Sequence, residues 1–261
     1  MKVEVIMPHG FCAGVERALR MAHAALAESG GAEAPEVYCL HGIVHNETVV
    51  QRLAAKGLRV VESVEEVPAD AVMLISAHGT SPANRVAAER RRVKIIDATC
   101  PFVAAAHATI RTNFKKGGMR TVVIGAPTHA EVRGYLGEPG ACLPEEVGPG
   151  EVTGQVVQTT LDAGAYEGVC TATRDRQQAV RDFVTAHRGG SVGVLVVGSG
   201  KSANTGRLVE IAEQAGAQAW RISSPYEINE CDFSHLDIIG VTSGASTPEE
   251  TLRAVLSALE T

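Results

Sequence analysis

Short runs of apolar residues alternate with amphipathic segments along the whole chain. The runs are rich in Val and Ile and nearly continuous, which is typical of strands buried on both faces of a parallel sheet. They cover residues 3–7, 71–77, 94–99, 121–126, 155–159, 192–198 and 236–244. Between the runs, residues 13–29 place their apolar side chains on one helical stripe, and a last helix begins after Ser246, Thr247 and Pro248. The pattern predicts an α/β protein built from strand–helix–strand units.

Three cysteines occupy the same place in a loose internal repeat. Cys12, Cys100 and Cys170 each follow a strand-like segment and precede a helical one. A thiol at a helix N-terminus has its pKa lowered by the free N–H groups and the helix dipole, and the thiolate is the form that binds metal. Taken singly, each is better explained as a buried free thiol. We expect the repeat to divide the chain into α/β units at residues 1–98, 99–167 and 168–261.

The remaining cysteines lack this context. Cys39, Cys142 and Cys231 are interpreted as ordinary thiols, and Cys142 falls in the most loop-like stretch, residues 136–154, which is rich in Gly, Pro and Glu. The chain has no C-x-x-C motif and no zinc-finger spacing. We therefore expect no disulfide framework.

Composition excludes several classes of partner and location. The 261 residues carry a net charge of −6, which argues against broad binding to nucleic acid or to an anionic membrane. No apolar run approaches the roughly 20 residues of a spanning helix, and the N-terminal strand pattern lacks the apolar core of a signal peptide. We expect a cytoplasmic protein.

Three thiolates that converge would leave one coordination position open. This could be the fourth position of a tetrahedral zinc or one iron of a [4Fe–4S] cluster. Convergence is plausible because ligands of open α/β folds gather where the strands end. An open metal position indicates catalysis rather than a structural site.

The other strand ends carry residues suited to a phosphorylated ligand. Backbone N–H groups at helix starts, hydroxyls and imidazoles bind phosphate, although capping and turn formation explain any one such loop. The candidates are His45, His78, His129, Glu131, Thr159, Ser202, Asn204 and Ser246. GSGKS is not a P-loop, because Leu195 stands where the motif needs glycine, and no G-x-G-x-x-G opens a helix.

At these residues the chain resembles the 4-hydroxy-3-methylbut-2-enyl diphosphate reductase family (LytB or IspH). The resemblance covers most of the chain in order. It consists of GFCAGVERA, VHN, SAHGTS, DATCP, THAEV, QTTL, C-T-A-T-x-x-R-Q-x-A-V, GS-x-K-S-x-N and VTSGAS. No single segment is decisive, but the ordered set is very specific.

The resemblance implies a trefoil of three α/β units, with short and mostly parallel sheets, around a central [4Fe–4S] cluster. Cys12, Cys100 and Cys170 match its ligands, and oxidation would leave a [3Fe–4S] remnant. It implies that the open iron binds the substrate's allylic hydroxyl, which two electrons and protons remove as water. The products are isopentenyl and dimethylallyl diphosphate. An external ferredoxin or flavodoxin is the expected electron donor, since the chain has no flavin or nicotinamide motif.

The resemblance also assigns roles to the polar loops. Glu131 matches the acid that delivers the proton, working with His129 and Thr159. The positions that match the diphosphate site are His45, His78, His129, Ser202, Asn204 and Ser246. The chemistry fits, because a buried carboxyl can stay protonated and a diphosphate anchors the substrate away from the reacting carbon.

Three departures from the family pattern leave a second interpretation open. Ala203 replaces the second of two serines, Ala130 replaces a proline, and His9 replaces an arginine. They allow a divergent paralogue with the same fold and cluster that acts on a different hydroxylated or unsaturated substrate. A non-catalytic metal- or phosphate-binding protein is less favoured because binding alone does not need Glu131. A zinc hydrolase is less favoured because no H-E-x-x-H motif is present.

Overall fold

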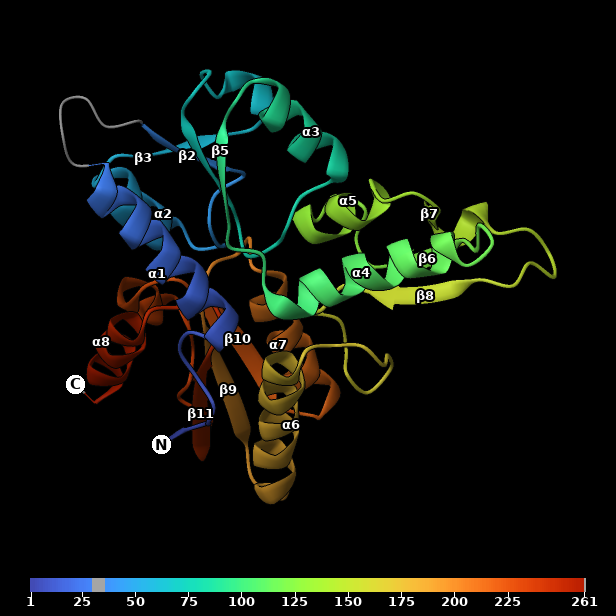
Figure 1. The fold of residues 1–261 in the computed structure, drawn as a ribbon. Helices are drawn as coiled ribbons and strands as arrows, with labels where there is room; N and C mark the ends of the chain where they lie inside the picture. Colours follow the sequence, from blue (N-terminus) through green and yellow to red (C-terminus); the bar gives the residue numbers. More distant parts are fainter. Residues whose placement is uncertain (30–35, 261) are drawn as a thin grey trace. The chain divides into compact units, whose positions relative to one another are not determined.

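The computed structural model describes residues 1–29 and 36–260 and has an α/β fold with three short sheets (Figure 1). Every strand pair among these residues is parallel. The chain divides into two compact units. The first comprises residues 1–12, 45–47 and 160–261, and the second comprises residues 13–44 and 48–159.

The first unit is a three-layer sandwich around one sheet, with strand order β1-β11-β9-β10. The strands are β1 (Lys2–Val5), β9 (Val192–Val197), β10 (Gln218–Ile222) and β11 (Ile238–Ser243). The helices are α6 (Thr171–Ala186), α7 (Ala203–Gln214) and α8 (Glu249–Leu259), with the 3₁₀ helix η3 (Pro225–Glu230). Alternate residues of β9 point to opposite faces: Val194 and Val196 pack with α6 and α7, whereas Leu195 and Val197 pack with α8 (Figure 1).

The second unit contains the other two sheets, with strand orders β3-β2-β4-β5 and β7-β6-β8. Its strands are β2 (Val37–Leu40), β3 (Leu58–Val61), β4 (Val72–Ile75), β5 (Lys94–Asp97), β6 (Thr121–Ile124), β7 (Ala141–Cys142) and β8 (Gly154–Val157). The α-helices are α1 (Ala13–Glu28), α2 (Glu47–Ala54), α3 (Pro82–Arg90), α4 (Pro101–Lys115) and α5 (Ala130–Leu136). Two 3₁₀ helices complete it, η1 (Val64–Glu66) and η2 (Pro144–Glu146).

Each sheet of the second unit has its own core. Met73 and Ile75 of β4 pack with Ala88 of α3 in one core. In the other, Val123 of β6 packs with residues of α4 and α5, among them Tyr135, which is fully buried. The polar loops at the strand ends are therefore carried on rigid, separately packed scaffolds.

The predicted fold class, α/β with short parallel sheets, is confirmed, and so are the helix over residues 13–29 and the C-terminal helix. One expectation needs correction: Cys142, predicted to lie in a loop, belongs to strand β7 and is buried. The first strand lies beside β11, with Lys2 opposite Ile238. The domain boundaries 1–98, 99–167 and 168–261 stay a prediction.

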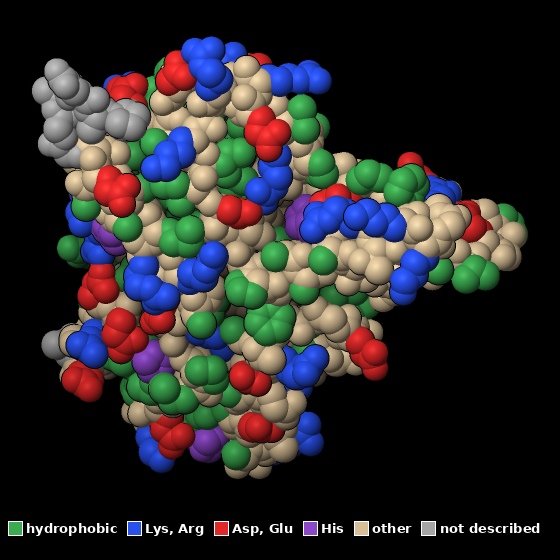
Figure 2. All heavy atoms as spheres, viewed as in Figure 1, with side chains coloured by type: hydrophobic (Ala, Val, Ile, Leu, Met, Phe, Trp, Pro, Cys, Tyr) green, Lys and Arg blue, Asp and Glu red, His purple; other side chains and the backbone are tan. Residues whose placement is uncertain are grey.

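The surface and the helices bear on the predicted partners. Over the face drawn in Figure 2, Lys and Arg side chains are interspersed with Asp and Glu. That face therefore carries no extended patch of charges of one sign. Among the described helices, none combines the length and the apolar character needed to cross a bilayer.

Candidate active site

Each of the three predicted cluster cysteines lies at the entrance to a helix. Cys100 and Cys170 occupy the N-cap positions of α4 and α6, and Cys12 directly precedes the first residue of α1. All three are partly buried, and no cysteine forms a disulfide. Cys12 and Cys170 belong to the first compact unit and Cys100 to the second. In the described part of the chain, no three His, Cys, Asp or Glu side chains are grouped as a metal site, so the ligand set stays a prediction.

The segments around Cys12 and Cys170 suit a negatively charged group. Arg176 of α6 is only 3% exposed. Burial lowers the pKa of its guanidinium, while the charges of Cys12 and Cys170 raise it, so both thiols are electrostatic neighbours of this cation. A buried cation needs compensating negative charge. Metal-bound thiolates would supply that charge, so the residues present fit an iron–sulfur cluster.

A chain of polar contacts leads from Cys170 to the predicted diphosphate loop. Cys170 Sγ lies 3.2 Å from Thr173 Oγ1, and that hydroxyl lies 3.4 Å from Asn204 Oδ1. The amide Nδ2 of Asn204 is buried without a hydrogen-bond partner among the described residues, so it can donate to a ligand. Ser202 caps α7 by accepting the N–H of Thr205 at 3.3 Å. This end of α7 offers hydrogen-bond donors to an anion.

The loop after β11 contacts two other predicted segments. Ser243 Oγ accepts the N–H of Gly10 at 2.8 Å, and the N–H of Cys12 donates to the carbonyl of Ala245 at 3.1 Å. Ser246 Oγ donates to the carbonyl of His45 at 3.1 Å. Burial lowers the pKa of His45, which favours the neutral imidazole. The loop after β11, which carries Ser246, is therefore hydrogen-bonded to the backbone of both His45 and Cys12.

Glu131, on the first turn of α5, is the most enclosed acid among the described residues of the second unit, at 2% exposure. Its Oε1 accepts the backbone N–H of Thr159 at 2.6 Å and the hydroxyl of Tyr135 at 2.9 Å. The Thr159 hydroxyl lies 3.0 Å from Oε2. Burial raises the pKa of Glu131, and these hydrogen bonds oppose the rise without cancelling it. The side chain is thus disposed to hold a proton.

Two histidines accompany this acid. His129 is the N-cap of α5, and its Nδ1 accepts the N–H of Glu131 at 3.3 Å. An accepting Nδ1 places the proton of the neutral ring on Nε2. The ring of His78 packs edge-on with that of His129, with 5.8 Å between centroids, and its Nδ1 lies 3.3 Å from Ser76 Oγ. The second unit therefore brings His78, His129, Glu131 and Thr159 into one cluster.

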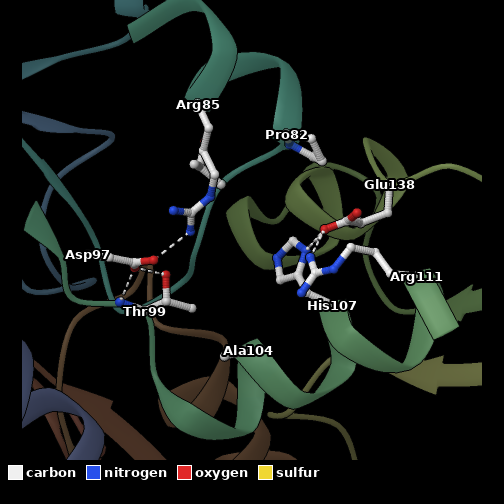
Figure 3. A pocket seen from close by; sticks show the side chains of 9 residues that line it. Pro82, Arg85, Asp97, Thr99, Ala104, His107, Arg111 and Glu138 are labelled. Carbon is white, nitrogen blue, oxygen red and sulfur yellow. Dashed lines mark hydrogen bonds and ion pairs between the residues drawn. The ribbon is translucent and has the colours of Figure 1, made fainter. Parts of the chain in front are cut away.

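Within the second unit, a cavity of about 420 Å³ lies near the elements that carry these four residues. Figure 3 shows its two charged sides: Arg85 pairs with Asp97 at 2.7 Å, and Arg111 pairs with Glu138 at 2.6 Å. His107 also contacts Glu138, with its Nδ1 at 2.7 Å, and burial lowers its pKa. Since each arginine is matched by a carboxylate, the cavity lacks the excess of positive charge that a diphosphate requires.

Sequence reasoning overlooked three contributors to the site: Tyr135, Thr173 and Arg176. Tyr135 stands four residues after Glu131 on the same helix, the spacing at which side chains meet. Thr173 and Arg176 lie on the buried stripe of α6 that continues through Val180. Polar residues on a buried stripe were the signal that could have identified both.

Comparison with known proteins gives a consistent result. The family model described as LytB protein matches residues 3–167 and 150–260. A 4-hydroxy-3-methylbut-2-enyl diphosphate reductase of Chromohalobacter salexigens is 36% identical, and the match covers 100% of this chain and 90% of the relative. The protein of the same description from Actinobacillus pleuropneumoniae serotype 7 is 37% identical, with the same coverage.

Two solved structures are also similar. The E-1-hydroxy-2-methyl-but-2-enyl-4-diphosphate reductase of Plasmodium falciparum has a TM-score of 0.91 at 27% identity, covering 100% of this chain and 88% of that one. A structure described as (E)-4-hydroxy-3-methyl-but-2-enyl diphosphate reductase, the terminal enzyme of the non-mevalonate pathway, has a TM-score of 0.68 at 28% identity. The match covers 100% of this chain and 99% of that structure's chain.

Proposed function

The chain belongs to the LytB protein family, and from this premise we propose that it is an iron–sulfur reductase of 4-hydroxy-3-methylbut-2-enyl diphosphate. The reaction removes the allylic hydroxyl as water, consuming two electrons and two protons, and yields isopentenyl and dimethylallyl diphosphate. It is the terminal step of the non-mevalonate isoprenoid pathway. The relatives are described as 4-hydroxy-3-methylbut-2-enyl diphosphate reductases, and one similar solved structure is described as the terminal enzyme of the non-mevalonate pathway.

The environment of Glu131 is the observation that carries this proposal. Expelling hydroxide requires a proton at the departing oxygen, and a buried carboxyl with a raised pKa keeps that proton to higher pH than an exposed one does. The Thr159 hydroxyl, 3.0 Å from Oε2, can orient the departing group or pass the proton to it. His129, fixed as the cap of the same helix, stands next to this acid. A protein that only bound phosphate would gain nothing from such an acid.

Cys12, Cys100 and Cys170 would hold a [4Fe–4S] cluster, which becomes [3Fe–4S] when oxidation removes the open iron. Bound there, the cluster supplies electrons and a Lewis acid for the hydroxyl. The buried Arg176 beside two of these cysteines supports a group of negative charge at this place. An external ferredoxin or flavodoxin would deliver the electrons one at a time.

The diphosphate would be bound by His45, His78, His129, Ser202, Asn204 and Ser246. Asn204 supports this role because its buried amide donor has no partner among the described residues. Imidazoles, hydroxyls and helix N-termini supply the remaining donors. Binding energy from the diphosphate then holds the allylic carbon in place for reaction.

Anaerobic purification with iron and sulfide analysis tests the cluster. We expect about four irons per chain (roughly three after oxidation) in the wild type. Each of the substitutions Cys12→Ser, Cys100→Ser and Cys170→Ser should abolish most of the iron. Cys231→Ser is the matched control, since Cys231 is also partly buried but stands outside the repeat. An iron-free wild type, or ligand variants that load like the control, would refute the cluster.

Turnover with a reduced viologen then tests the substrate. We expect the loaded enzyme to convert 4-hydroxy-3-methylbut-2-enyl diphosphate into the two five-carbon diphosphates. A loaded enzyme that leaves this compound unchanged would refute the substrate while leaving the cluster intact.

Ala203, the first residue of α7, is the observation that favours the paralogue. It lies beside Ser202, whose hydroxyl already caps the helix, so position 203 itself offers the diphosphate no hydroxyl. The substitution Ala203→Ser supplies one, and a hydrogen bond to a charged group is worth about 1.5–3 kcal/mol. For the proposed substrate we expect KM to fall by roughly 10-fold or more. A KM that rises, with activity on another hydroxylated compound, would favour the paralogue.

A further inference from the structure

Arg176 is a buried cation whose role the proposed reaction leaves unexplained. It lies on the inward stripe of α6, at 3% exposure, where the following turns carry Val180 and Phe183. Within the described residues, no carboxylate forms an ion pair with it, and its Nε has no hydrogen-bond partner. Burying an unpaired guanidinium costs several kcal/mol. A helix that needed only packing would place an apolar residue here.

The guanidinium joins the two cysteine segments of the first unit. Its Nη2 donates to the carbonyl of Gly10 at 2.8 Å, two residues before Cys12. Its Nη1 donates to the carbonyl of Ala172 at 3.0 Å, two residues after Cys170. One planar fork therefore contacts segments that are distant in sequence, a geometry that the single ammonium of lysine does not reproduce.

The Cys12 segment is shaped to receive this contact. Gly10 has a φ of 71°, in the left-handed region that favours glycine. Its N–H donates to Ser243 Oγ and its carbonyl accepts from Arg176, so both polar groups of this residue are engaged. With the N–H of Cys12 bonded to Ala245, the segment is fixed at three points. Of these three hydrogen bonds, only the one from Arg176 comes from a side chain that also contacts the Cys170 segment. Replacing the arginine removes that connection.

We infer that Arg176 positions the Cys12 and Cys170 segments for a shared iron–sulfur cluster and, through its buried positive charge, favours the cluster's reduced state. The inference rests on the proposed function, because it presupposes the cluster. Reduction adds one electron and hence one negative charge, which a nearby cation in a low-dielectric site stabilises. The charge and the two hydrogen bonds make separable contributions: the charge sets the potential, and the bonds set how firmly the cysteines hold the cluster.

The experiment compares Arg176→Met with Arg176→Lys in anaerobically reconstituted holoenzyme without substrate. The readouts are iron and sulfide content and a redox titration followed by electron paramagnetic resonance. We expect Arg176→Met to shift the one-electron reduction equilibrium toward the oxidised state by at least about tenfold, equivalent to ~59 mV. Arg176→Lys keeps the positive charge but loses the pair of hydrogen bonds that the guanidinium makes. Its reduction potential should therefore stay near the wild-type value, whereas its cluster should be lost faster on exposure to chelator.

Arg174→Met is the matched control. Arg174 lies on the same helix but is exposed, so the solvent screens its charge and the potential should not move. A loaded Arg176→Met enzyme with the wild-type potential would overturn the inference while leaving the proposed function standing. A reduction potential that shifts as much in Arg176→Lys as in Arg176→Met would also overturn the inference. If Arg176→Met does not bind a cluster, the potential of Arg176→Lys relative to the wild type decides the question. A wild type without iron and sulfide would instead refute the proposed function itself.

Discussion

At Glu131, two opposing effects decide what the carboxyl can do. Three hydrogen bonds from Thr159 and Tyr135 favour the charged form, yet complete burial outweighs them and raises the pKa. All three contacts come from one strand end and one helix, so the acid cannot turn toward water without breaking them. A proton held in this way is shielded from solvent.

The substitution Glu131→Gln keeps the shape and the acceptor Oε1 but removes the proton that can be transferred. Because general acid catalysis contributes about 10²–10⁴-fold, we expect kcat to fall by that amount. Iron content and the KM for the diphosphate should change little, since neither depends on this proton. Turnover with reduced viologen measures the first and steady-state kinetics the second. Turnover equal to the wild type would show that another group donates the proton.

The raised pKa of Glu131 also predicts how stability depends on pH. Between the ordinary value of 4.5 and the raised value, the folded state holds a proton that the unfolded state has lost. The free energy of unfolding therefore falls as pH rises through this window, whereas below pH 4.5 both states are protonated and the effect vanishes. Glu131→Gln lacks this dependence, so its stability relative to the wild type should increase with pH. Urea denaturation at several pH values measures the difference, and a constant difference would contradict the prediction.

At the scale of elements, the turn between β6 and α5 is what places His129 and Glu131. Gly125 ends the strand with a φ of 154°, and a Cβ there would lie 2.7 Å from Gln158 Cβ and from Val132 Cγ2. Gln158 Oε1 in turn accepts the N–H of Ala126 at 3.0 Å, which locks the turn to the strand end that carries Thr159. The approach is so close that only glycine fits.

Gly125→Ala should therefore destabilise the protein by about 1–3 kcal/mol through overpacking and backbone strain. It should also lower kcat, because the turn that moves carries the acid and its neighbours. Gly206→Ala is the control: Gly206 lies inside α7 with open space around its Cβ position, so alanine should stabilise the helix by roughly 0.5–1 kcal/mol. Denaturant unfolding measures both. Equal effects at the two sites would show that the contacts around Gly125 are not restrictive.

The hydrophobic pattern located most strands, including β1, β4, β5, β6, β8, β9 and β11, and missed β2, β3, β7 and β10. β9 and β11 are buried at all six positions and read as continuous apolar runs. The edge strands β3 and β10 interrupt their apolar residues with exposed arginines, and β7 has only two residues. β2 is central and fully buried but was missed, although β4, with the same length and burial, was located. Strand pairing, more than propensity, creates these elements.

At the scale of the molecule, the sequence could say which residue types end the strands but not which of them meet. The pairing of β1 with β11 brings Gly10 and Cys12 to Ser243 and Ala245, a long-range contact that no local pattern contains. In contrast, Cys12, Cys100 and Cys170 could be singled out because each repeats one local context. Contacts such as those of Arg176 required the fold, since they join chain segments far apart in sequence.

The proposed cysteine ligands are divided between the two compact units, Cys12 and Cys170 in one and Cys100 in the other. A cluster bound by all three would add its binding free energy to the folded state alone. Removing it with chelator under anaerobic conditions should lower Tm by roughly 5–10 °C, the shift expected for a few kcal/mol of linkage in a chain of this size. Scanning calorimetry before and after removal measures the shift. Cys100→Ser should unfold like the cluster-free wild type, and Cys231→Ser should retain the full difference. A Tm that is the same with and without iron would show that the cluster does not stabilise the folded chain.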